Sequence, residues 1–463
     1  MRADQGSTGE QAGNPKTGGS PTGWFRATYR SLRIHREFSV RHGRIAAKRV
    51  RLYACRAAPE PHGRPAALMI EPIPLAAVPG MLDGAAVRLA AVAGHLEDLF
   101  RIVPPAAPQA WFFGARLRPG PGVPAFGVAG LGTSPAEALA KCLGEAVEVA
   151  SLFERGDEAL SDELASRLPD AGLGADVAPP ARLWAAVRRE PDGAPFRIPL
   201  ALRVRTCPPD RHGVPSAPLG LGTGAGPTAG DALRHGLLEL IERDAVALWW
   251  RAGRPARRLA ADAVEATAAF AELAALRGTM PHRPVTVVDL ATDLPVTALA
   301  VFSTGPDGRG FAFGAAARPT FAEALRASLL ELLQMELAQD LAAWKADTLG
   351  DGTLTDLDRR HLARRQGPPP AELPQVAAMP RADIGPDEDL AGKTLPASAT
   401  EILEGCATMG HTIYSADCTR ADLQLPVIRV YGPEMQPEPC RIVKFRMVSW
   451  RARTGFTWDS PLF

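Results

Sequence analysis

Three stretches of the chain share one pattern of apolar positions, and each interrupts that pattern with carboxylates. They read AEALAKCLGEAVE at residues 136–148, GDALRHGLLELIERDA at residues 230–245 and AEALRASLLELLQ at residues 322–334. Apolar residues recur at helical spacing in all three, so each stretch is predicted to form an amphipathic helix. Acidic residues on an otherwise buried face require a reason other than solubility.

Short apolar runs rich in β-branched residues lie between and after these helices. Residues 283–290 and 294–302 are typical of strands and are separated by the turn-prone sequence Ala-Thr-Asp. Farther along, residues 400–410 have helical spacing and end in glycine, whereas residues 412–419 and 425–433 are typical of strands. The pattern predicts an α+β fold in which helices pack on a sheet.

The three acidic helices align on their Ala-Leu pairs at a period of roughly 90 residues, which indicates one supersecondary unit used three times. The aligned columns are Ser134, Thr228 and Thr320; Glu137, Asp231 and Glu323; Glu145, Glu239 and Glu331; and Glu148, Glu242 and Gln334. A Gly- or Ala-rich segment precedes each helix, at residues 126–135, 219–228 and 313–320. We expect each unit to consist of a strand, a glycine turn and an acidic helix.

The first two columns have a structural explanation. A Ser or Thr three residues before an acidic residue, at the start of an apolar-periodic run, is an N-terminal capping box. Thr228 with Asp231 fits this pattern, as do the equivalent pairs of the other two units. We therefore expect these residues to begin the helices.

The later columns need a different explanation. Residues three apart share a helix face, so Glu145 points the same way as Glu148, and Glu239 the same way as Glu242. Buried carboxylates side by side repel, which favours a compensating cation. Mg²⁺ is a hard ion that prefers oxygen ligands, and Arg243 adds a charged fork suited to phosphate. The alternative is an acidic pair neutralised by the protein's own arginines.

Composition and charge narrow the class of protein. The chain has 463 residues, 46% of them hydrophobic, and its 52 Lys and Arg nearly balance its 51 Asp and Glu. This balance favours a small or neutral partner over nucleic acid or an anionic membrane. The six cysteines form no CxxC pair, which is typical of reduced thiols and disfavours zinc. No signal peptide or membrane span is recognisable, so we expect a cytoplasmic location.

The combined motifs resemble the YcaO family. The residues that carry the resemblance are LGEAVE at 143–148, LLELIERDA at 237–245, the Glu-x-x-Gln of the third helix, and SADCTRADLQLPVIRVYGPEM at 415–435. The last segment is similar to a family segment in which an Asp-x-Thr strand end leads to a Pro-Val-x-Arg-Val strand. The resemblance covers about residues 112–437.

The resemblance implies an ATP-dependent cyclodehydratase. Family members of known activity bind ATP and Mg²⁺ between acidic helices and phosphorylate the oxygen of a peptide-bond carbonyl. A Cys, Ser or Thr side chain of a ribosomally made precursor peptide then adds at that carbon, giving an azoline. Other members form a thioamide or an amidine, and a non-catalytic scaffold that binds the precursor peptide is a further alternative. A leader-peptide-binding partner protein and a homodimer are also implied.

The resemblance also assigns residue roles and domains. It implies that Glu145, Glu148, Glu239 and Glu242 bind metal, and that Glu239, Glu242 and Arg243 are catalytic. Asp231, Lys141 and Arg243 are expected to contact the cofactor together with Glu145 and Glu148, while Glu331 and Gln334 match the third helix. Residues 1–22 are expected to form a disordered tail. Residues 23–110 lie outside the resemblance and are expected to form an N-terminal region for peptide binding or dimerisation, and the resemblance implies that residues 111–463 are the YcaO-like ATP-binding domain.

The sequence departs from the family pattern at three positions. Leu131 stands where the family has a lysine between two glycines, Lys141 replaces a helix serine, and Pro227 replaces an asparagine. Lys141 is expected to pair with Glu145 on the next helical turn or to reach a phosphate. His235 is interpreted as a packing or surface residue, because no second histidine supports a metal site.

Overall fold

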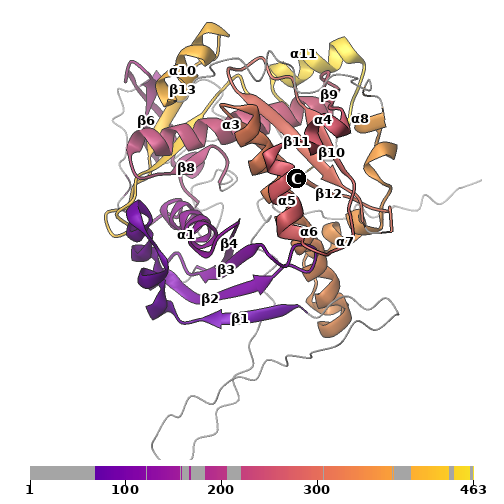
Figure 1. The fold of residues 1–463 in the computed structure, drawn as a ribbon. Helices are drawn as coiled ribbons and strands as arrows, with labels where there is room; N and C mark the ends of the chain where they lie inside the picture. The colour runs from indigo at the N-terminus through magenta and orange to yellow at the C-terminus, as the bar shows by residue number, and fades with distance from the viewer. Residues whose placement is uncertain are drawn as a thin grey trace, which may run out of the picture.

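The structure is a computed structural model that describes residues 68–120, 123–156, 158, 166–167, 183–205, 220–305, 307–377, 379, 398–436, 443–458 and 462. The predicted tail at residues 1–22 and residues 23–67 of the predicted N-terminal region lie outside the described residues. Within those ranges strands and helices mix along the chain (Figure 1), which confirms the predicted α+β class.

The strands form three sheets that are antiparallel except for one short parallel pair, β5 with β7. The first sheet is ordered β1 (Met69–Ile73), β2 (Leu96–Val103), β3 (Trp111–Leu117) and β4 (Phe126–Gly132). The second is ordered β12 (Ala312–Arg318), β11 (Thr297–Ser303), β10 (Val285–Asp289) and β9 (Arg257–Arg258). The third is ordered β5 (Ser166–Arg167), β7 (Pro195–Pro199), β6 (Trp184–Glu190), β13 (Ile413–Asp417), β14 (Val427–Tyr431) and β8 (Thr223–Ala225).

The repeated unit occupies equivalent places in the three sheets. Strands β4, β8 and β12 each lie at the end of their sheet's strand order. A long helix follows each of them directly: α1 (Pro135–Ser151), α3 (Ala229–Ala252) and α6 (Phe321–Leu349). These helices match the three acidic stretches predicted from the sequence.

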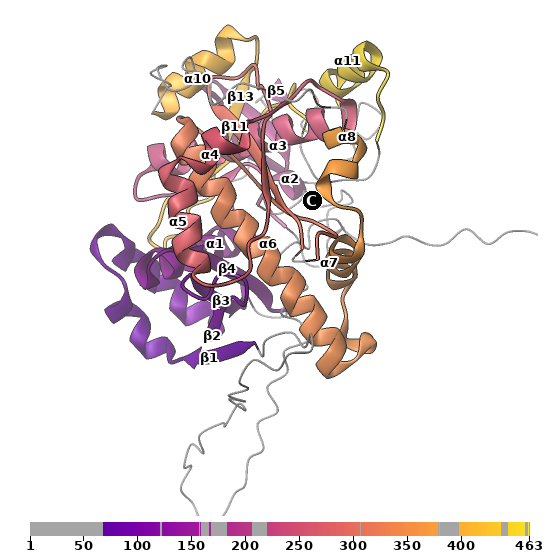
Figure 2. The same ribbon diagram turned by 45° about the vertical axis from the view of Figure 1, so that its right-hand side comes forward.

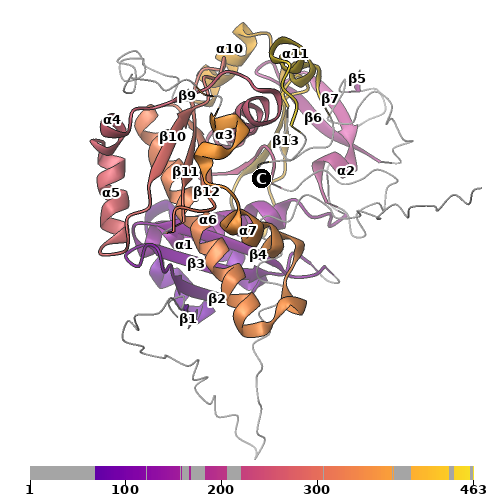
Figure 3. The same cartoon turned by 90° about the vertical axis from the view of Figure 1, so that its right-hand side faces the viewer.

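The three helices close a ring around a common centre. Each helix packs on the strand that precedes it and also on the edge strand of another unit: α1 on β8, α3 on β12 and α6 on β4. Figure 2 shows α6 crossing the front of the molecule, and Figure 3 shows α1, α3 and α6 between the three sheets. Residues on the inner faces of these helices therefore converge although they are far apart in the sequence.

The remaining helices cover the outside of this arrangement. They are α2 (Leu200–Arg203), α4 (Ala261–Glu265), α5 (Ala268–Arg277), α7 (Asp356–Gln366), α8 (Pro374–Ala377), α10 (Ala399–Thr408) and α11 (Phe445–Thr454), with 3-10 segments at Leu75–Met81, Gly84–His95, Asp351–Thr353 and Pro370–Glu372. None of the helices in the described ranges is both long and apolar enough to cross a bilayer.

The first and third predicted glycine turns are mostly strands, β4 and β12, so that part of the prediction is wrong. In the second segment only β8 is a strand, and residues 220–222 turn the chain before it. The strand glycines allow each helix to approach its strand closely. A Cβ atom added at Gly130 would lie 2.3 Å from the Ala138 carbonyl oxygen, and one at Gly224 would lie 2.4 Å from that of Ala232. Short segments after these strands turn the chain, which places the helix starts beside the strand ends.

The predicted domain boundary at residue 111 falls between two strands of one sheet. Strands β1 and β2 precede it, and β3 and β4 follow it. Phe100 and Ile102 of β2 also belong to the same buried cluster as Trp249 of α3 and Phe313 of β12. The described part of the N-terminal region, from residue 68 onward, therefore packs with the rest of the fold.

The strands and helix predicted downstream of the second acidic helix are confirmed. Residues 283–290 and 294–302 contain β10 and β11, which pair with each other. Residues 400–410 contain α10, followed by Gly410 with φ +80°. Strands β13 and β14 are neighbours in the third sheet, and β14 pairs directly with β8. The similar segment at residues 415–435 therefore lies beside the second repeated unit.

Candidate functional site

Each acidic helix begins with a side-chain cap, as the sequence predicts. The Thr228 hydroxyl accepts a hydrogen bond from the Asp231 backbone N–H at 3.1 Å, and Thr320 accepts one from Glu323 at 3.3 Å. In α1 the Ser134 hydroxyl caps Glu137 at 3.2 Å. These caps satisfy backbone groups that the helix leaves unpaired and fix the start of each helix next to its strand.

One glutamate in each helix then binds the edge of its own strand. Glu145 accepts a hydrogen bond from Ala129 N at 2.7 Å, Glu239 from Thr223 N at 3.3 Å and Glu331 from Ala315 N at 2.9 Å. Donor and acceptor are 16 residues apart in every case. An edge strand has backbone N–H groups that need partners. The same contact in all three units shows that the aligned glutamates have equivalent positions.

The second glutamates connect the units. Glu148 of α1 accepts a hydrogen bond from Ala225 N of β8 at 2.8 Å, so it binds a strand of the next unit. Glu242 of α3 lies 3.5 Å from Arg243 Nε, and its side chain is only 9% exposed. Burial of an ionised carboxylate is costly, so a further cation beside Glu242 would favour its ionised form.

The five glutamates Glu145, Glu148, Glu239, Glu242 and Glu331, hereafter the carboxylate cluster, share one electrostatic environment. Burial, together with the negative charges of Glu239 and Glu145, raises the pKa of Glu148 to about 8. Carboxylates from two different helices thus influence each other at this centre. The acidic helices therefore lie close together at this centre.

The other pKa shifts in the carboxylate cluster have the same cause. Burial raises the pKa of Glu239 to about 7, against the opposing charge of Arg243. Burial likewise raises the pKa of Glu242 to about 8, with Glu331 contributing repulsion, and it raises the pKa of Glu331. Groups with raised carboxyl pKa values that lie next to one another are typical of cation-binding or catalytic sites.

Arg243 lies beside the cluster without neutralising it closely. Its Nε atom is 3.8 Å from Glu239 Oε1 and 3.5 Å from Glu242 Oε1. Both distances exceed the ordinary range of a hydrogen-bonded ion pair. Arg243 therefore lies where the resemblance implies, next to both glutamates of the second pair.

Two predicted cofactor residues have structural partners instead. The Asp231 carboxylate accepts hydrogen bonds from the backbone and hydroxyl of Thr228, which completes the capping box. Lys141 was expected to pair with Glu145, but its Nζ atom lies 2.9 Å from Glu137 Oε1 and 3.0 Å from the Leu131 carbonyl oxygen. The Lys141 side chain points toward the start of the helix, because Glu137 and the carbonyl at the strand end both lie there. Gln334 is half-buried, one helical turn after Glu331.

Two arginines near the cluster were not selected from the sequence. Arg318 ends β12, and its charge opposes the rise in the pKa of Glu242 and of Glu331. Arg429 of β14 is 2% exposed, and its charge opposes the rise in the pKa of Glu239. Arg429 belongs to the Pro-Val-x-Arg-Val segment, which is a signal that could have identified it. Arg318 aligns with glycines in the other two units, so comparing the three repeats could not have identified it as a site residue.

The carboxylate cluster fits a metal that is shared with a ligand. In the described part of the chain, no three His, Cys, Asp or Glu side chains are close enough to form a metal site by themselves. Mg²⁺ usually takes one or two carboxylates and completes its shell with water and phosphate oxygens. The oxygen-only donor set and the raised carboxyl pKa values suit such a hard cation.

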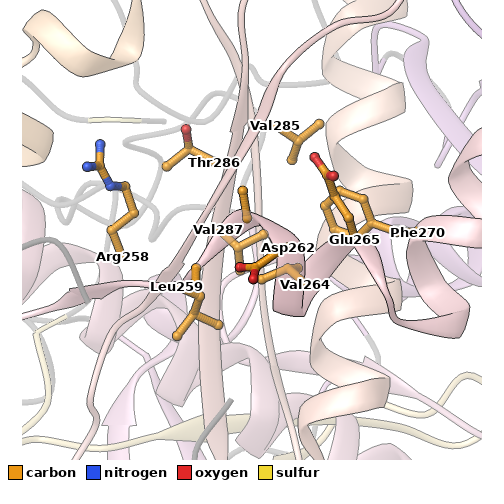
Figure 4. Close-up of a pocket in the computed structure, with 11 residues that line it drawn as sticks. Arg258, Leu259, Asp262, Val264, Glu265, Phe270, Val285, Thr286 and Val287 are labelled. Carbon is orange, nitrogen blue, oxygen red and sulfur yellow. The ribbon is translucent and has the colours of Figure 1, made fainter. Parts of the chain in front are cut away.

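A separate pocket lies away from the cluster, beside β9, β10 and α4 (Figure 4). Its volume is about 500 Å³, and its lining includes Arg258, Asp262, Glu265, Phe270 and Thr286. None of these residues belongs to the three acidic helices. The pocket therefore offers charged residues outside the carboxylate cluster, at which control substitutions can be made.

Comparison with known proteins defines the class. The sequence of residues 129–436 matches the family model described as YcaO cyclodehydratase, ATP- and Mg²⁺-binding. That range is most of the described chain and contains all three acidic helices. The chain belongs to the YcaO family, an enzyme family whose cofactors are ATP and Mg²⁺. A search of curated proteins found no match.

Solved structures share the fold at low sequence identity. A heterocyclase in complex with substrate and cofactor is 21% identical, with a TM-score of 0.63 over 85% of this chain. The chain spans 58% of the length of that heterocyclase. YcaO from Methanopyrus kandleri bound with AMPPCP and Mg²⁺ is 19% identical, with a TM-score of 0.55 over 80% of this chain and 91% of its own.

A third similar structure belongs to an assembly. The E. coli microcin synthetase McbBCD complex contains a chain that is 14% identical, with a TM-score of 0.51 over 71% of this chain and 85% of its own. The same complex with pro-MccB17 bound matches with a TM-score of 0.50 at 15% identity, over 70% of this chain and 85% of that one. These similarities confirm the YcaO-like fold.

Proposed function

We propose that the carboxylate cluster binds Mg²⁺ with ATP, and that the protein uses them to activate backbone amides of a precursor peptide. The observation that carries this proposal is the convergence of glutamates from three helices, in which burial raises the carboxyl pKa of Glu239 to about 7, that of Glu148 and Glu242 to about 8, and that of Glu331 as well. Among the described residues, no arginine lies within hydrogen-bond distance of Glu242, and Arg243 Nε is 3.5 Å from its Oε1. A divalent cation would hold these carboxylates in their ionised form.

The residues of the cluster would divide the work by position. Glu145, Glu239 and Glu331 are oriented by their strands, because each uses Oε2 on a backbone N–H. Glu148 and Glu242 lie one helical turn farther along and would contact the cation. When bound, Mg²⁺ neutralises phosphate charge and polarises the phosphoryl oxygens.

Arg243 is the residue best placed to assist phosphoryl transfer. Its guanidinium lies beside both Glu239 and Glu242, and it keeps its charge at any pH of interest. Catalysis of phosphoryl transfer depends mainly on positioning and on stabilising charge at the phosphoryl oxygens. We therefore infer that Arg243 contacts the transferring phosphoryl group and that the carboxylates bind the Mg²⁺ that accompanies ATP.

The proposed product is an azoline formed from Cys, Ser or Thr of a ribosomally made peptide. Activation by phosphate turns the amide oxygen into a leaving group, and the neighbouring side chain supplies the nucleophile. The similar fold of chains in the McbBCD complex, which has a structure with pro-MccB17 bound, supports a peptide substrate and a partner protein. A homodimer is part of the same proposal, and sedimentation of the purified chain checks it.

Mass spectrometry tests the proposed reaction. The chain is incubated with ATP, Mg²⁺ and synthetic peptides that contain Cys, Ser or Thr, with and without candidate leader-binding proteins. The proposal predicts loss of one water per ring, dependent on ATP. With sulfide or an amine added as nucleophile, replacement of the amide oxygen by sulfur would indicate a thioamide, and its replacement by nitrogen would indicate an amidine.

A peptide-binding scaffold without catalysis is the second candidate. It is favoured by Leu131, which replaces the family's lysine and is only 1% exposed, so it offers no polar group to a ligand. Calorimetry with AMPPCP and Mg²⁺ separates the two candidates. Binding supports the enzyme, whereas a folded chain that binds no nucleotide supports the scaffold.

A further inference from the structure

Helix α3 carries acidic side chains on two opposite sides. Successive residues of an α-helix are turned by about 100°, so Asp244 points about 200° away from Glu242. Glu242 belongs to the carboxylate cluster, whereas Asp244 is 0% exposed and lies on the side of α3 where α11 packs. Figures 1 and 2 show α11 above α3 and α1, which carries two residues of the cluster, below it. Asp244 therefore belongs to a contact separate from the carboxylate cluster.

Both carboxylate oxygens of Asp244 have partners from the C-terminal part of the described chain. Oδ1 accepts a hydrogen bond from the Gln436 backbone N–H at 2.7 Å. Oδ2 accepts one from Arg446 Nε of α11 at 3.0 Å. Burial raises the pKa of Asp244, and the charge of Arg446 opposes that rise. Two segments that follow β14 thus bind one buried acid of α3.

The guanidinium of Arg446 joins Asp244 to a second acid. Its Nη1 atom donates to Asp293 Oδ2 at 3.0 Å, and its Nη2 atom donates to Asp293 Oδ1. Asp293 lies in the segment between β10 and β11. It also accepts a hydrogen bond from Arg254, just after the end of α3, at 3.2 Å. One arginine therefore connects α3, α11 and the β10–β11 segment, through Nε on one side and a two-pronged fork on the other.

This network balances its own charge. It contains two carboxylates, Asp244 and Asp293, and two guanidiniums, Arg446 and Arg254. It has no excess charge that favours a bound ion. Buried ion pairs add little stability compared with apolar packing, and their best-supported use is to select one arrangement of packed elements. The network is therefore suited to fixing how α3 lies against its neighbours.

Helix α3 depends on directional contacts for its rotation. Residues 244–252 are buried all round the helix, so this half has no single apolar stripe that defines which side faces inward. On the cluster side, Glu239 accepts a hydrogen bond from Thr223 N at 3.3 Å. On the opposite side, Asp244 accepts two shorter bonds, at 2.7 and 3.0 Å. The contacts of Asp244 are therefore the stronger restraint on the rotation of α3.

The rotation of α3 decides where the catalytic side chains point. Arg243 directly precedes Asp244, and Glu242 precedes Arg243. The ends of these side chains lie farther from the helix axis than the backbone does, so a small rotation moves them most. A misplacement of about 1 Å in a catalytic site can cost about 100-fold in rate. A contact on the far side of α3 can therefore control the reaction without touching the nucleotide.

We propose that Arg446 is a positioning residue that holds α3 in its active rotation through Asp244. It directs Arg243 and Glu242 toward the phosphates and the cation of the nucleotide. This inference rests on the proposed function and extends it to α11. Arg446 lies outside residues 129–436, the range that matches the family model.

Steady-state phosphate release from ATP by the full chain tests this role. Arg446→Lys keeps the positive charge but cannot bind both acids with a planar fork. Its kcat should fall at least about tenfold, while the KM for ATP should change less than about threefold, because misplaced groups weaken the transition state more than substrate binding. Arg453→Lys is the matched control on the same helix. Arg453 is exposed and stacks on Trp450 at 5.2 Å, so this variant should keep the wild-type kcat.

Free guanidinium ions give a readout that a merely structural role would not affect. The Arg446 side chain is 13% exposed, so the space that it leaves can be reached from solvent. Arg446→Ala should lose turnover, and millimolar guanidinium chloride should restore at least about threefold of it, because the free ion can bind both carboxylates. The same concentration of sodium chloride serves as the control.

The outcomes separate this inference from the proposed function. A wild-type kcat in folded Arg446→Lys would overturn the positioning role and leave the proposed function in place. A rise in KM alone, or a folded Arg446→Ala that guanidinium does not reactivate, would overturn it as well. Folded wild type that releases no phosphate from ATP would end the proposed function and this inference with it. Should Arg446→Lys not fold, Asp293→Asn decides by the same kcat criterion, because it weakens the fork and leaves Asp244 in place.

Discussion

Two glutamates on helix α6, Glu336 and Glu331, differ in how closely arginines neutralise them. Glu336 of α6 is 1% exposed, and Arg277 binds it through two nitrogens at 2.8 and 3.1 Å. The Ser303 hydroxyl donates to it at 2.6 Å, and Arg283 lies 3.3 Å away. The protein therefore neutralises this buried charge completely with its own side chains.

Glu331, five residues earlier on α6, has none of these partners at such distances. It accepts a hydrogen bond from Ala315 N at 2.9 Å, and burial raises its carboxyl pKa. Arg243 and Arg318 influence it only as nearby charges. Among the described residues, arginines bind Glu336 at ion-pair distance, whereas Glu331 has only nearby arginine charges. This difference supports the proposal that an external cation binds at the carboxylate cluster.

The largest expected effect concerns the structural acid. Glu336→Gln leaves Arg277 and Arg283 buried without their counter-charge, so the free energy of unfolding should fall by about 3–5 kcal/mol. Chemical denaturation measures this loss. Glu331→Gln is the matched substitution on the same helix, and it should change the free energy of unfolding far less. An equal loss of unfolding free energy in the two variants would contradict the distinction between the structural acid Glu336 and the cluster residue Glu331.

The next effect is on activity. Glu239→Gln and Glu242→Gln should each lower ATP turnover by at least about 100-fold, because preorganised charge at the phosphates is lost. Their stability should be preserved, since neutral glutamine relieves repulsion within the cluster. Phosphate release in steady state, together with thermal unfolding, measures both quantities. Glu323→Gln changes a carboxylate in a capping box of α6 and serves as the control. Wild-type turnover in both cluster variants would contradict the metal assignment.

A smaller effect tests how closely the helices must approach their strands. Gly224→Ala places a Cβ 2.4 Å from the Ala232 carbonyl oxygen and 2.6 Å from Gly236 N, so α3 must move away from β8. Such overpacking should cost about 1–3 kcal/mol of stability. Gly230→Ala is the control, because its nearest neighbour is Thr228 Oγ1 at 3.7 Å. Thermal unfolding of both variants should separate them, and equal midpoints would contradict the close packing.

The smallest effect concerns pH. The pKa of Glu148 and that of Glu242 are raised to about 8 in the folded state, so between about pH 5 and 8 the folded chain binds more protons than the unfolded chain. Without metal and nucleotide, stability should therefore fall as the pH rises through this window. Thermal unfolding across the window measures the slope. Glu242→Gln should reduce it, and a slope unchanged by that substitution would contradict the raised pKa.

Much of this arrangement is predictable because it depends on local chemistry. The capping pairs, such as Thr228 with Asp231, and the helical faces of Glu145 and Glu239 follow from spacing alone. The strand character of the glycine-rich segments does not follow, because glycine there serves the close approach of a helix that is known only after folding. The hydrogen-bond partner of Lys141 also cannot be predicted, because the turn between strand and helix places Glu137 and the Leu131 carbonyl next to its Nζ atom.

Arg318 shows the limit of the sequence most clearly. It stands where the other two units have Gly132 and Gly226, so the repeat gives it no counterpart. Its position among Lys141, His235 and Glu242 results from the packing of α3 on β12. Contacts of this kind join residues from three units and are set by the closed ring of helices. Only the folded chain shows them.

Binding of Mn²⁺, a paramagnetic substitute for Mg²⁺, tests the central claim most directly. Electron paramagnetic resonance measures bound Mn²⁺ with and without AMPPCP in wild type, Glu148→Gln and Glu242→Gln. We expect wild type to bind Mn²⁺ when AMPPCP is present, and both variants to lose most of this binding while remaining folded. Undiminished Mn²⁺ binding in both variants, or none in folded wild type with AMPPCP, would contradict the claim.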